Sequence, residues 1–372
     1  MRIGVPKEIK NHEYRVGLVP DAIHELVDHG HELFVETNAG QGIGFNDSDY
    51  EAAGAKVLAS AADVFATAEM IVKVKEPQAV ERAMLTADHV LFTYLHLAPD
   101  PEQTADLVKG GATCIAYETV TDSRGGLPLL APMSEVAGRL SIQAGAHSLE
   151  KVRGGAGVLL GGVPGTPSAN VVVIGGGTVG LNATQMAVGM GARVTVLDRS
   201  LDVLRRLDAH YEGRIETAYS NKAAIERTVL DADLVIGGVL IPGAAAPKLV
   251  TGDHVRRMRP GSVLVDVAID QGGCFETSHA TTHAEPTYVV DDVVHYCVAN
   301  MPGAVPRTST FALNHATQRF VVDLANKGAL RAMAEDPHLR DGLNVHRGKV
   351  TCEEVAHDLG YDYVSAEDAL GL

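Results

Sequence analysis

The sequence contains no tryptophan and only four cysteines among its 372 residues. The cysteines lie far apart and form no C-x-x-C pair, so their spacing matches neither a disulfide framework nor a cysteine metal site. Isolated cysteines of this kind are typical of buried thiols in a reducing compartment. We therefore expect neither a structural disulfide nor a bound metal. The four residues are Cys114, Cys274, Cys297 and Cys352.

The sequence also lacks a long hydrophobic run and an excess of positive charge. No apolar stretch approaches the roughly 18 residues that a membrane-spanning helix needs. The N-terminus carries Glu8 and no long apolar segment, so we expect no signal peptide. The formal net charge is −16, without a basic stripe, which argues against nucleic acid as the main partner. These absences predict a cytoplasmic protein that binds neither membranes nor nucleic acid.

What is present is an ordinary globular composition, with 46% hydrophobic and 21% charged residues, in a chain long enough for two domains. The first 130 residues alternate predicted strands with predicted helices, such as those over residues 21–28 and 102–109. This alternation is typical of an α/β domain with a mostly parallel sheet. The strands are predicted over residues 31–37, 70–74, 90–94 and 113–117.

A second set of elements follows a long helix predicted over residues 133–153, with Ser134 near its N-cap or in its first turn. Another long helix is predicted over residues 307–325, and shorter helices follow Gly328. The last 65 or so residues are too few and too helical for a sheet domain of their own, so we expect them to return to the first domain. The middle segment has strands near residues 171–174, 193–197, 233–236, 262–267, 288 and 295.

The predicted fold is therefore two doubly wound, Rossmann-like α/β domains with mostly parallel sheets. A dinucleotide-binding domain of residues 131–305 is inserted into a substrate domain made of residues 1–130 and 306–372. The two long helices would act as a hinge at a cleft between the domains.

The dinucleotide prediction comes from residues 171–180, where an apolar run enters a G-x-G-x-x-G turn at Gly175, Gly177 and Gly180. In this motif the first glycine makes the tight turn, the second lets a pyrophosphate approach the backbone, and the third lets helix pack on strand. A second apolar run ends on Asp198, which can accept hydrogen bonds from a ribose diol. The motif alone is weak, but strand, turn, helix, strand and acid in register predict dinucleotide binding rather than an ordinary strand–helix turn.

Two lysines close a predicted strand in the segment VKVKEP, residues 72–77. By alternation, Lys73 and Lys75 point to one side, while Val72 and Val74 point to the core. Ligands of open parallel sheets bind at the carboxyl ends of strands, where a lysine can hold a carboxylate. The alternative is a pair of solvated lysines at a strand edge.

Three further residues occupy similar positions. His96 follows the strand predicted over residues 90–94 and suits proton transfer, although it could equally be a surface or capping histidine. Asp270 ends a buried strand in a glycine turn, where a nicotinamide would lie; the alternative is an Asx-turn aspartate. Arg15 follows the first strand, and its fork can grip a carboxylate, but by sequence alone it is one arginine among many. Together they offer the groups that hydride transfer needs.

Taken together and in order, the motifs resemble the alanine dehydrogenases and, more loosely, the NAD-binding subunit of nicotinamide nucleotide transhydrogenases. The resemblance covers nearly the whole chain, and many of its motifs are long. They are MRIGVPKE with Arg15, VKVKEP at 72–77, FTYLHL at 92–97, APMSEVAGR at 131–139, GGVPG at 161–165, DVAIDQGG at 266–273 and VANMP at 298–302.

The resemblance implies a homohexamer that reversibly converts L-alanine and NAD to pyruvate, ammonium and NADH. It implies that Arg15 and Lys75 hold the substrate carboxylate and that His96 and Asp270 handle protons. The family often has Lys or Arg where this chain has Val203, so no cofactor contact is assigned there. Besides the glycine turn, the implied cofactor residues are Ser134, Asp198, Ser220, Val239, Leu240, Val267, Ala268, Ile269, Asp270, Val298, Ala299, Asn300 and Met301.

Asp198 predicts NAD over NADP, because a 2′-phosphate would meet its negative charge. The neighbouring Arg199 could partly offset that repulsion, and the alternative is that Asp198 merely caps the segment beginning at Ser200.

Two other functions remain open. One is a soluble component of a transhydrogenase, which would need other subunits because this chain has no membrane span. The other is a non-catalytic dinucleotide sensor, against which the presence of Lys75, His96 and Asp270 at strand ends counts.

Overall fold

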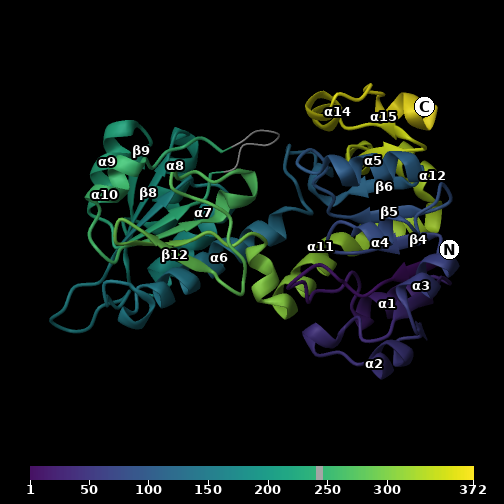
Figure 1. The fold of residues 1–372 in the computed structure, drawn as a ribbon, viewed down its shortest axis with the longest axis horizontal. Coiled ribbons are helices and arrows are strands. Elements are labelled where there is room, and N and C mark those ends of the chain that lie inside the picture. The colour runs from purple at the N-terminus through teal and green to yellow at the C-terminus, as the bar shows by residue number, and fades with distance from the viewer. Residues whose placement is uncertain (240–245) are drawn as a thin grey trace. The chain divides into compact units, whose positions relative to one another are not determined.

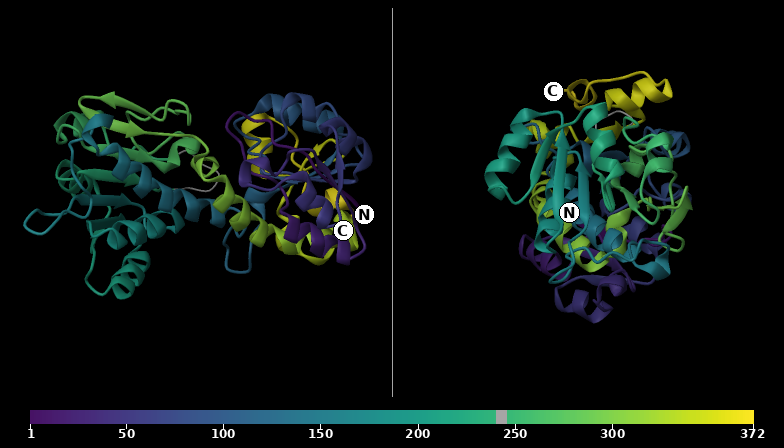
Figure 2. Two further views of the ribbon diagram at one scale, coloured as in Figure 1. Left: turned by 90° about the horizontal axis from the view of Figure 1, so that it is seen from below. Right: turned by 90° about the vertical axis from the view of Figure 1, so that its left-hand side faces the viewer.

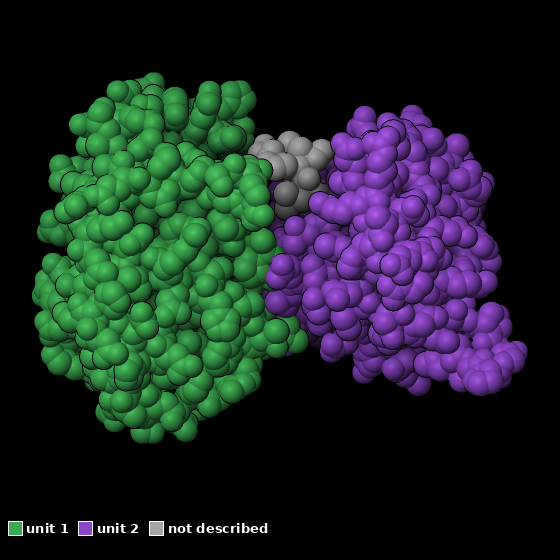
Figure 3. All heavy atoms as spheres, turned by 180° about the vertical axis from the view of Figure 1, so that it is seen from behind, with its two compact units in different colours: residues 1–133, 305–372 green, residues 134–304 purple. Residues whose placement is uncertain are grey.

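The computed structural model describes residues 1–239 and 246–372, and the chain forms two compact units (Figure 1, Figure 3). Unit 1 contains residues 1–133 and 305–372, and unit 2 contains residues 134–304. The chain leaves unit 1 within helix α6 (Ala131–Ser148) and returns to it just before helix α11 (Pro306–Lys327). Unit 2 is therefore an insertion in the chain of unit 1, and each unit has its own sheet.

Unit 1 is built on an eight-stranded sheet with the order β15-β14-β6-β5-β4-β1-β2-β3. Strands β1 to β6 are parallel, β14 is antiparallel to β6, and β15 is antiparallel to β14. The strand order reverses between β1 and β4, and in open parallel sheets ligands bind outside the carboxyl ends of the strands at such a point. The strands are β1 (Arg2–Val5), β2 (Glu32–Glu36), β3 (Lys56–Leu58), β4 (Met70–Val72), β5 (Val90–Thr93), β6 (Thr113–Ala116), β14 (Leu343–His346) and β15 (Lys349–Val350).

Local sequence signals define the helices of unit 1, as α5 illustrates. Asp100 accepts a hydrogen bond from the N–H of Gln103 (3.0 Å), Pro101 occupies the first turn, and Gly111 ends the helix in the left-handed conformation. Buried residues of α5 and α3 pack with those of β4, β5, β6 and β14 in one core. Besides α11, the helices are α1 (Pro20–Asp28), α2 (Asp47–Ala52), α3 (Ala61–Thr67), α4 (Ala79–Arg82), α5 (Pro101–Gly110), α12 (Ala329–Glu335), α13 (Pro337–Arg340), α14 (Glu353–Leu359) and α15 (Ala366–Leu370).

Unit 2 is built on a seven-stranded sheet with the order β12-β13-β11-β10-β7-β8-β9, parallel except for β12. Helices lie on both faces of this sheet (Figure 2), and residues 171–174 of the central strand are accordingly buried. The strands are β7 (Asn170–Ile174), β8 (Arg193–Asp198), β9 (Glu216–Tyr219), β10 (Leu234–Gly237), β11 (Val263–Asp266), β12 (Thr287–Val290) and β13 (Val293–Tyr296). Besides α6, the helices are α7 (Thr178–Gly189), α8 (Leu201–Tyr211), α9 (Lys222–Leu230) and α10 (Gly252–Arg257).

The predicted fold class, two doubly wound α/β sheets with one inserted in the other, is confirmed. The helix predicted over residues 133–153 is wrong at both ends, because α6 starts at Ala131 and stops at Ser148. Ser134 is the fourth residue of α6, so it lies in the first turn, one of the two expected positions, and not at the N-cap. Beyond Ser148 the chain folds back, and a Cβ on Gly155 would lie 2.3 Å from the carbonyl oxygen of Ser148.

The C-terminal segment was expected to be helical, but it also contributes strands β14 and β15 to the first sheet. Strand β14 has the sequence LNVH, which alternates apolar and polar residues, and all four residues are buried. Four residues are too few to separate a strand period from a helix period, and β15 has only two residues, which explains the missed strands.

The close approach of α7 to the turn before it makes the third glycine of the motif testable. A Cβ on Gly180 would lie 1.7 Å from the carbonyl oxygen of Gly175, whereas a Cβ on Gly189, in the same helix, would meet nothing within 4 Å. We predict that Gly180→Ala lowers the free energy of unfolding by about 3 kcal/mol or more, since backbone must move to admit the methyl group.

The matched variant Gly189→Ala should leave the free energy of unfolding unchanged or raise it by up to about 1 kcal/mol, because alanine is the better helix former. Chemical denaturation of both variants checks the prediction. Equal stabilities would show that α7 can move away from the turn at little cost.

Candidate active site

The carboxyl ends of the parallel strands in unit 1 gather most of the residues singled out in the first domain. Lys73 and Lys75 follow β4, His96 follows β5, and the segment containing Arg15 follows β1. Because parallel strands end at the same edge of a sheet, these segments are neighbours at the point where the strand order reverses.

Alternation predicted that Lys73 and Lys75 point to one accessible side, and for Lys73 this prediction is wrong. Its side chain is fully buried, and its ammonium group lies 3.1 Å from a carboxylate oxygen of Glu8 and 2.7 Å from one of Glu81. Burial lowers the pKa of Lys73, but the charges of Glu8 and Glu81 outweigh this effect, so the net shift is upward. Strand β4 stops at Val72, and α4 covers this side of its end with Glu81, which explains the wrong prediction. Lys73 is a structural residue.

Side-chain hydrogen bonds help to fix the main chain that leads to Lys75. The Glu8 carboxylate accepts from the N–H of Val74 (2.7 Å), and the hydroxyl groups of Tyr117 and Thr93 donate to the carbonyls of Lys73 and Lys75 (both 3.0 Å). The Lys75 side chain is 12% exposed, and its ammonium group lies 3.8 Å from a carboxylate oxygen of Glu76. Lys75 is therefore a held but accessible cation, as a carboxylate-binding residue should be.

Arg15 is a buried cation whose orientation is set by Glu13. The guanidinium donates from Nε (2.7 Å) and Nη2 (2.6 Å) to the two carboxylate oxygens of Glu13, and Nη1 lies 3.0 Å from the sulfur of Met133. Burial lowers the pKa of Arg15, but the hydrogen bonds and charge of Glu13 more than compensate, with smaller contributions from Tyr94 and Glu8. The bidentate pair fixes the plane of the guanidinium group.

His96 lies beyond the end of β5 in an unusual backbone conformation. Its φ is +50°, in the left-handed region, and its side chain is 44% exposed. The imidazole ring is parallel to the ring of Tyr94, with a ring-centroid distance of 5.8 Å and an interplanar angle of 3°. An exposed imidazole on an ordered backbone is suited to exchange protons with a substrate.

In unit 2 the glycine turn after β7 has the shape that a dinucleotide requires. Gly175 has a φ of +100°, and a Cβ on it would lie 2.8 Å from the carbonyl oxygen of Gly238. A Cβ on Gly177 would meet nothing within 4 Å, so the protein leaves open the space next to this glycine, at the N-terminus of α7. An open backbone surface at a helix N-terminus fits a pyrophosphate. Leu240, by contrast, lies outside the described residues.

Asp198 closes β8 and bonds to two loops. Its Oδ2 accepts from the N–H of Gly176 and its Oδ1 from the N–H of Ser200, both at 2.7 Å. Ser200 itself caps α8, accepting from the N–H of Val203 (3.3 Å). The carboxylate is half-buried, so it supports both the glycine turn and the start of α8 and keeps further acceptor capacity toward a ribose. Arg199, next to it, is exposed.

Asp270 lies in the 3₁₀ turn η4 (Val267–Gln271) after β11, and it is exposed. The Asx-type turn considered for it belongs instead to Asp266, which is fully buried and accepts from the N–H groups of Ala268, Cys274 and Phe275 (each 3.2 Å) and from the hydroxyl of Ser278 (2.6 Å). Asp266 therefore shapes the loop that presents Asp270.

The other residues assigned to the cofactor follow the carboxyl ends of further parallel strands. Ser220 follows β9, Val239 follows β10, and residues 267–270 and 298–301 follow β11 and β13. Ser134 is half-buried in the first turns of α6. Ile269, Val298 and Met301 are buried, while Val267, Ala268, Ala299 and Asn300 are half-buried. This edge of the second sheet is where nucleotides bind in doubly wound folds.

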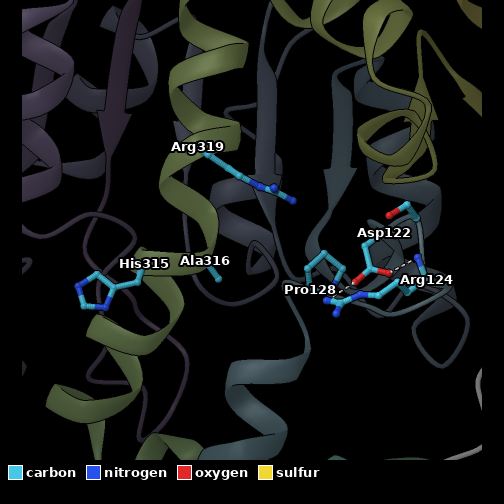
Figure 4. A pocket seen from close by; sticks show the side chains of 7 residues that line it. Asp122, Arg124, Pro128, His315, Ala316 and Arg319 are labelled. Atoms are coloured by element: carbon cyan, nitrogen blue, oxygen red, sulfur yellow. Dashed lines mark hydrogen bonds and ion pairs between the residues drawn. The ribbon is translucent and has the colours of Figure 1, made fainter.

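One hollow in unit 1 contains none of the site residues described above. This hollow of about 590 Å³ is lined by residues 122–124, Pro128 and three residues of α11, His315, Ala316 and Arg319 (Figure 4). Among the described residues, no group of His, Cys, Asp and Glu side chains could hold a metal ion. Within residues 1–239 and 246–372, no helix has the length and apolar character to span a membrane.

Four acidic residues of the candidate site were missed by the sequence analysis: Glu8, Glu13, Glu118 and Asp266. Each accepts from main-chain N–H groups or from a cation of the protein. Glu118 and Asp266 stand at the end of a strand, as His96 does, so the same positional rule could have found them. Glu13 carries no such signal, because it lies within a loop and not at the end of a strand. Its partner Arg15 is two residues away in the same loop.

The different roles of Lys73 and Lys75 can be separated by matched substitutions. Lys73→Met leaves two buried carboxylates without their cation and should lower the free energy of unfolding by about 3–5 kcal/mol. Lys75→Met removes one long ion pair and should change it by about 1 kcal/mol or less while weakening binding of a carboxylate substrate. Denaturant unfolding and substrate titration check both. The assignment is wrong if Lys75→Met is the less stable variant.

Two protein-family models match the chain. The model described as "Alanine dehydrogenase/PNT, N-terminal domain" matches residues 4–137, and the one described as "Alanine dehydrogenase/PNT, C-terminal domain" matches residues 141–353. Curated proteins named alanine dehydrogenase match over 100% of this chain. That of Halomonas elongata is 62% identical and covered over 100% of its length, and those of Bacillus subtilis and Mycobacterium tuberculosis are 56% and 52% identical, covered over 98% and 100%.

Solved structures give the same result. A structure titled L-alanine dehydrogenase superposes with a TM-score of 0.94 at 53% identity, over 97% of this chain and 99% of that one. The structure of a transhydrogenase from Sinorhizobium meliloti superposes with a TM-score of 0.82 at 25% identity, over 94% and 100%. The resemblance inferred from the motifs is confirmed, and the chain belongs to the alanine dehydrogenase/PNT family.

Proposed function

We propose that the protein is an NAD-dependent alanine dehydrogenase, which oxidatively deaminates L-alanine to pyruvate and ammonium and catalyses the reverse reaction. The observation that carries the proposal is the identity of 52–62% over the whole chain to curated alanine dehydrogenases, together with the held cations at the carboxyl edge of the first sheet. Homohexameric assembly and a cytoplasmic location stay predictions of the family resemblance.

In the proposed reaction, Lys75 and Arg15 bind the carboxylate of the substrate. Hydrogen bonds hold the main chain at Lys75, and Glu13 holds the plane of the Arg15 guanidinium, so neither cation has to be ordered when the substrate binds. The buried side chains near Arg15 include Met133 and Tyr94.

His96 and Asp270 handle the protons. Oxidation at Cα gives an imine, water adds to it, and ammonia leaves the resulting carbinolamine. His96 takes a proton from the attacking water and returns it to the amine, and Asp270 takes the proton of the carbinolamine hydroxyl as the carbonyl forms and ammonia leaves; that proton then converts ammonia to ammonium. Both side chains are exposed, and the carboxylates of Glu118 and Asp266 accept from N–H groups of the segments that carry them, which suits groups that must reach a substrate.

The glycine turn, Asp198 and the loops after β9, β10, β11 and β13 would hold the dinucleotide, whose nicotinamide ring supplies the hydride acceptor when it is bound. Gly177 leaves room for the pyrophosphate, and the half-buried Asp198 carboxylate lies where the adenosine ribose binds in this fold. A 2′-phosphate at that place would meet a carboxylate that already bonds to Gly176 and Ser200 and cannot readily move away. The site therefore favours NAD over NADP.

We predict that the purified protein alone forms NADH from L-alanine and NAD, with kcat/KM for NAD higher than that for NADP by about tenfold or more. Absorbance of NADH at alkaline pH measures the forward reaction, and loss of NADH with pyruvate and ammonium measures the reverse. Lys75→Met, in which substrate binding should be weaker, is the matched control.

The assignment is wrong if neither direction is observed. Hydride exchange between two nicotinamide nucleotides that appears only after a partner protein is added would favour a transhydrogenase component instead, as the structural similarity to a transhydrogenase also allows.

A further inference from the structure

Glu118 is bonded to the main chain of His96 and of the residue before it. It lies in the 3₁₀ turn η2 (Tyr117–Thr119), directly after β6, and its side chain is 13% exposed. Its Oε1 accepts a hydrogen bond from the N–H of His96 (2.6 Å) and one from the N–H of Leu95 (3.1 Å), and its Oε2 lies 3.2 Å from the same Leu95 N–H. One carboxylate therefore satisfies two consecutive peptide groups beyond the end of β5.

These hydrogen bonds hold His96 in a conformation that its own side chain disfavours. The φ of His96 is +50°, a region that residues with a Cβ rarely adopt. Such a conformation persists when the surroundings determine it. The carboxylate of Glu118 accepts from both N–H groups of the turn, and the carbonyl of Leu95 accepts from the side chain of Gln103 (2.6 Å).

The contact acts on the backbone of His96 rather than on its ring. Nδ1 of His96 lies 3.7 Å from Oε1 of Glu118, beyond hydrogen-bond distance. The ring instead lies parallel to Tyr94, whose hydroxyl donates to the carbonyl of Leu129 (2.5 Å). The backbone turn at His96 sets the position of its Cβ, and the ring of Tyr94 lies parallel to the imidazole ring.

We propose that Glu118 is a positioning residue for proton transfer, which sets the left-handed turn at His96 and thereby aims the imidazole at the substrate. This proposal rests on the proposed function and adds a residue to it. Glu118 acts through acceptor geometry, so an oxygen acceptor of the right length should replace it and a shorter carboxylate should not.

Three variants test this geometry. In Glu118→Gln a carbonyl oxygen at the same distance can still accept both N–H groups, and we expect kcat within about tenfold of the parent. Glu118→Asp keeps the charge but withdraws the acceptor, and Glu118→Ala removes it, so kcat should fall by about 10²-fold in both, a loss typical of displaced acid–base catalysis. KM for NADH should change little. Glu102→Ala, at an exposed glutamate of the same unit, is the control.

A double-mutant cycle separates positioning from a merely structural role. If Glu118 acts through His96, Glu118→Asp should lower kcat by less than about threefold in a His96→Ala background, because the group it positions is gone. A further loss in that background equal to the loss in the parent would overturn the proposal. So would a Glu118→Gln variant less active than Glu118→Asp, because charge and not geometry would then matter. Glu118→Gln and Glu118→Asp carry the test if Glu118→Ala does not fold.

Hydrogen exchange keeps this proposal distinct from the proposed function. A parent protein without alanine turnover would contradict the proposed function. The anchor, meaning the hydrogen bonds from the N–H groups of residues 95 and 96 to Glu118, would then be judged by hydrogen exchange of these two amides alone. Faster exchange of these amides in Glu118→Asp than in Glu118→Gln supports the anchor. Equal exchange in parent and both variants overturns it.

Discussion

The arrangement of the first sheet's carboxyl edge, where the parallel strands of unit 1 end, depends on the buried ammonium group of Lys73. A fully buried cation needs carboxylate partners, and it takes them from Glu8, after β1, and Glu81, on α4. The segment after β1 is thereby tied to the segment after β4 at the point where the strand order reverses. The second oxygen of Glu8 holds the main chain of Val74, so the same network sets the position of Lys75.

The second sheet meets the same need with other carboxylates. Asp198 holds the glycine turn and the start of α8, and the fully buried Asp266 holds the loop that carries Asp270. Together with Glu8 and Glu118, these acids accept main-chain N–H groups just beyond the ends of strands. Loops there have no strand partners for their N–H groups, so side-chain acceptors order them. The groups proposed to meet the ligands are then carried on loops that are already ordered.

The sequence predicted the parts of this arrangement that depend on chain-wide patterns. Alternating strands and helices gave the two sheets, and the glycine spacing gave the turn before α7. Whether an individual polar side chain is buried or exposed depends on which elements pack over it, and the sequence pattern does not contain that information. By alternation Lys73 and Lys75 share one side of the chain after β4, yet Glu81 of α4 lies against Lys73, while Lys75 is paired with Glu76. Likewise β14 is buried on both faces and too short to show a period.

The central claim of the proposed function is that L-alanine gives the hydride of its Cα directly to a nicotinamide nucleotide. It is tested most directly with L-alanine that carries deuterium at Cα. Mass spectrometry of the products should find that deuterium in the NADH formed, and NADH made from unlabelled alanine in heavy water should carry none. Deuterium released from Cα to the solvent, with unlabelled NADH, would contradict the account.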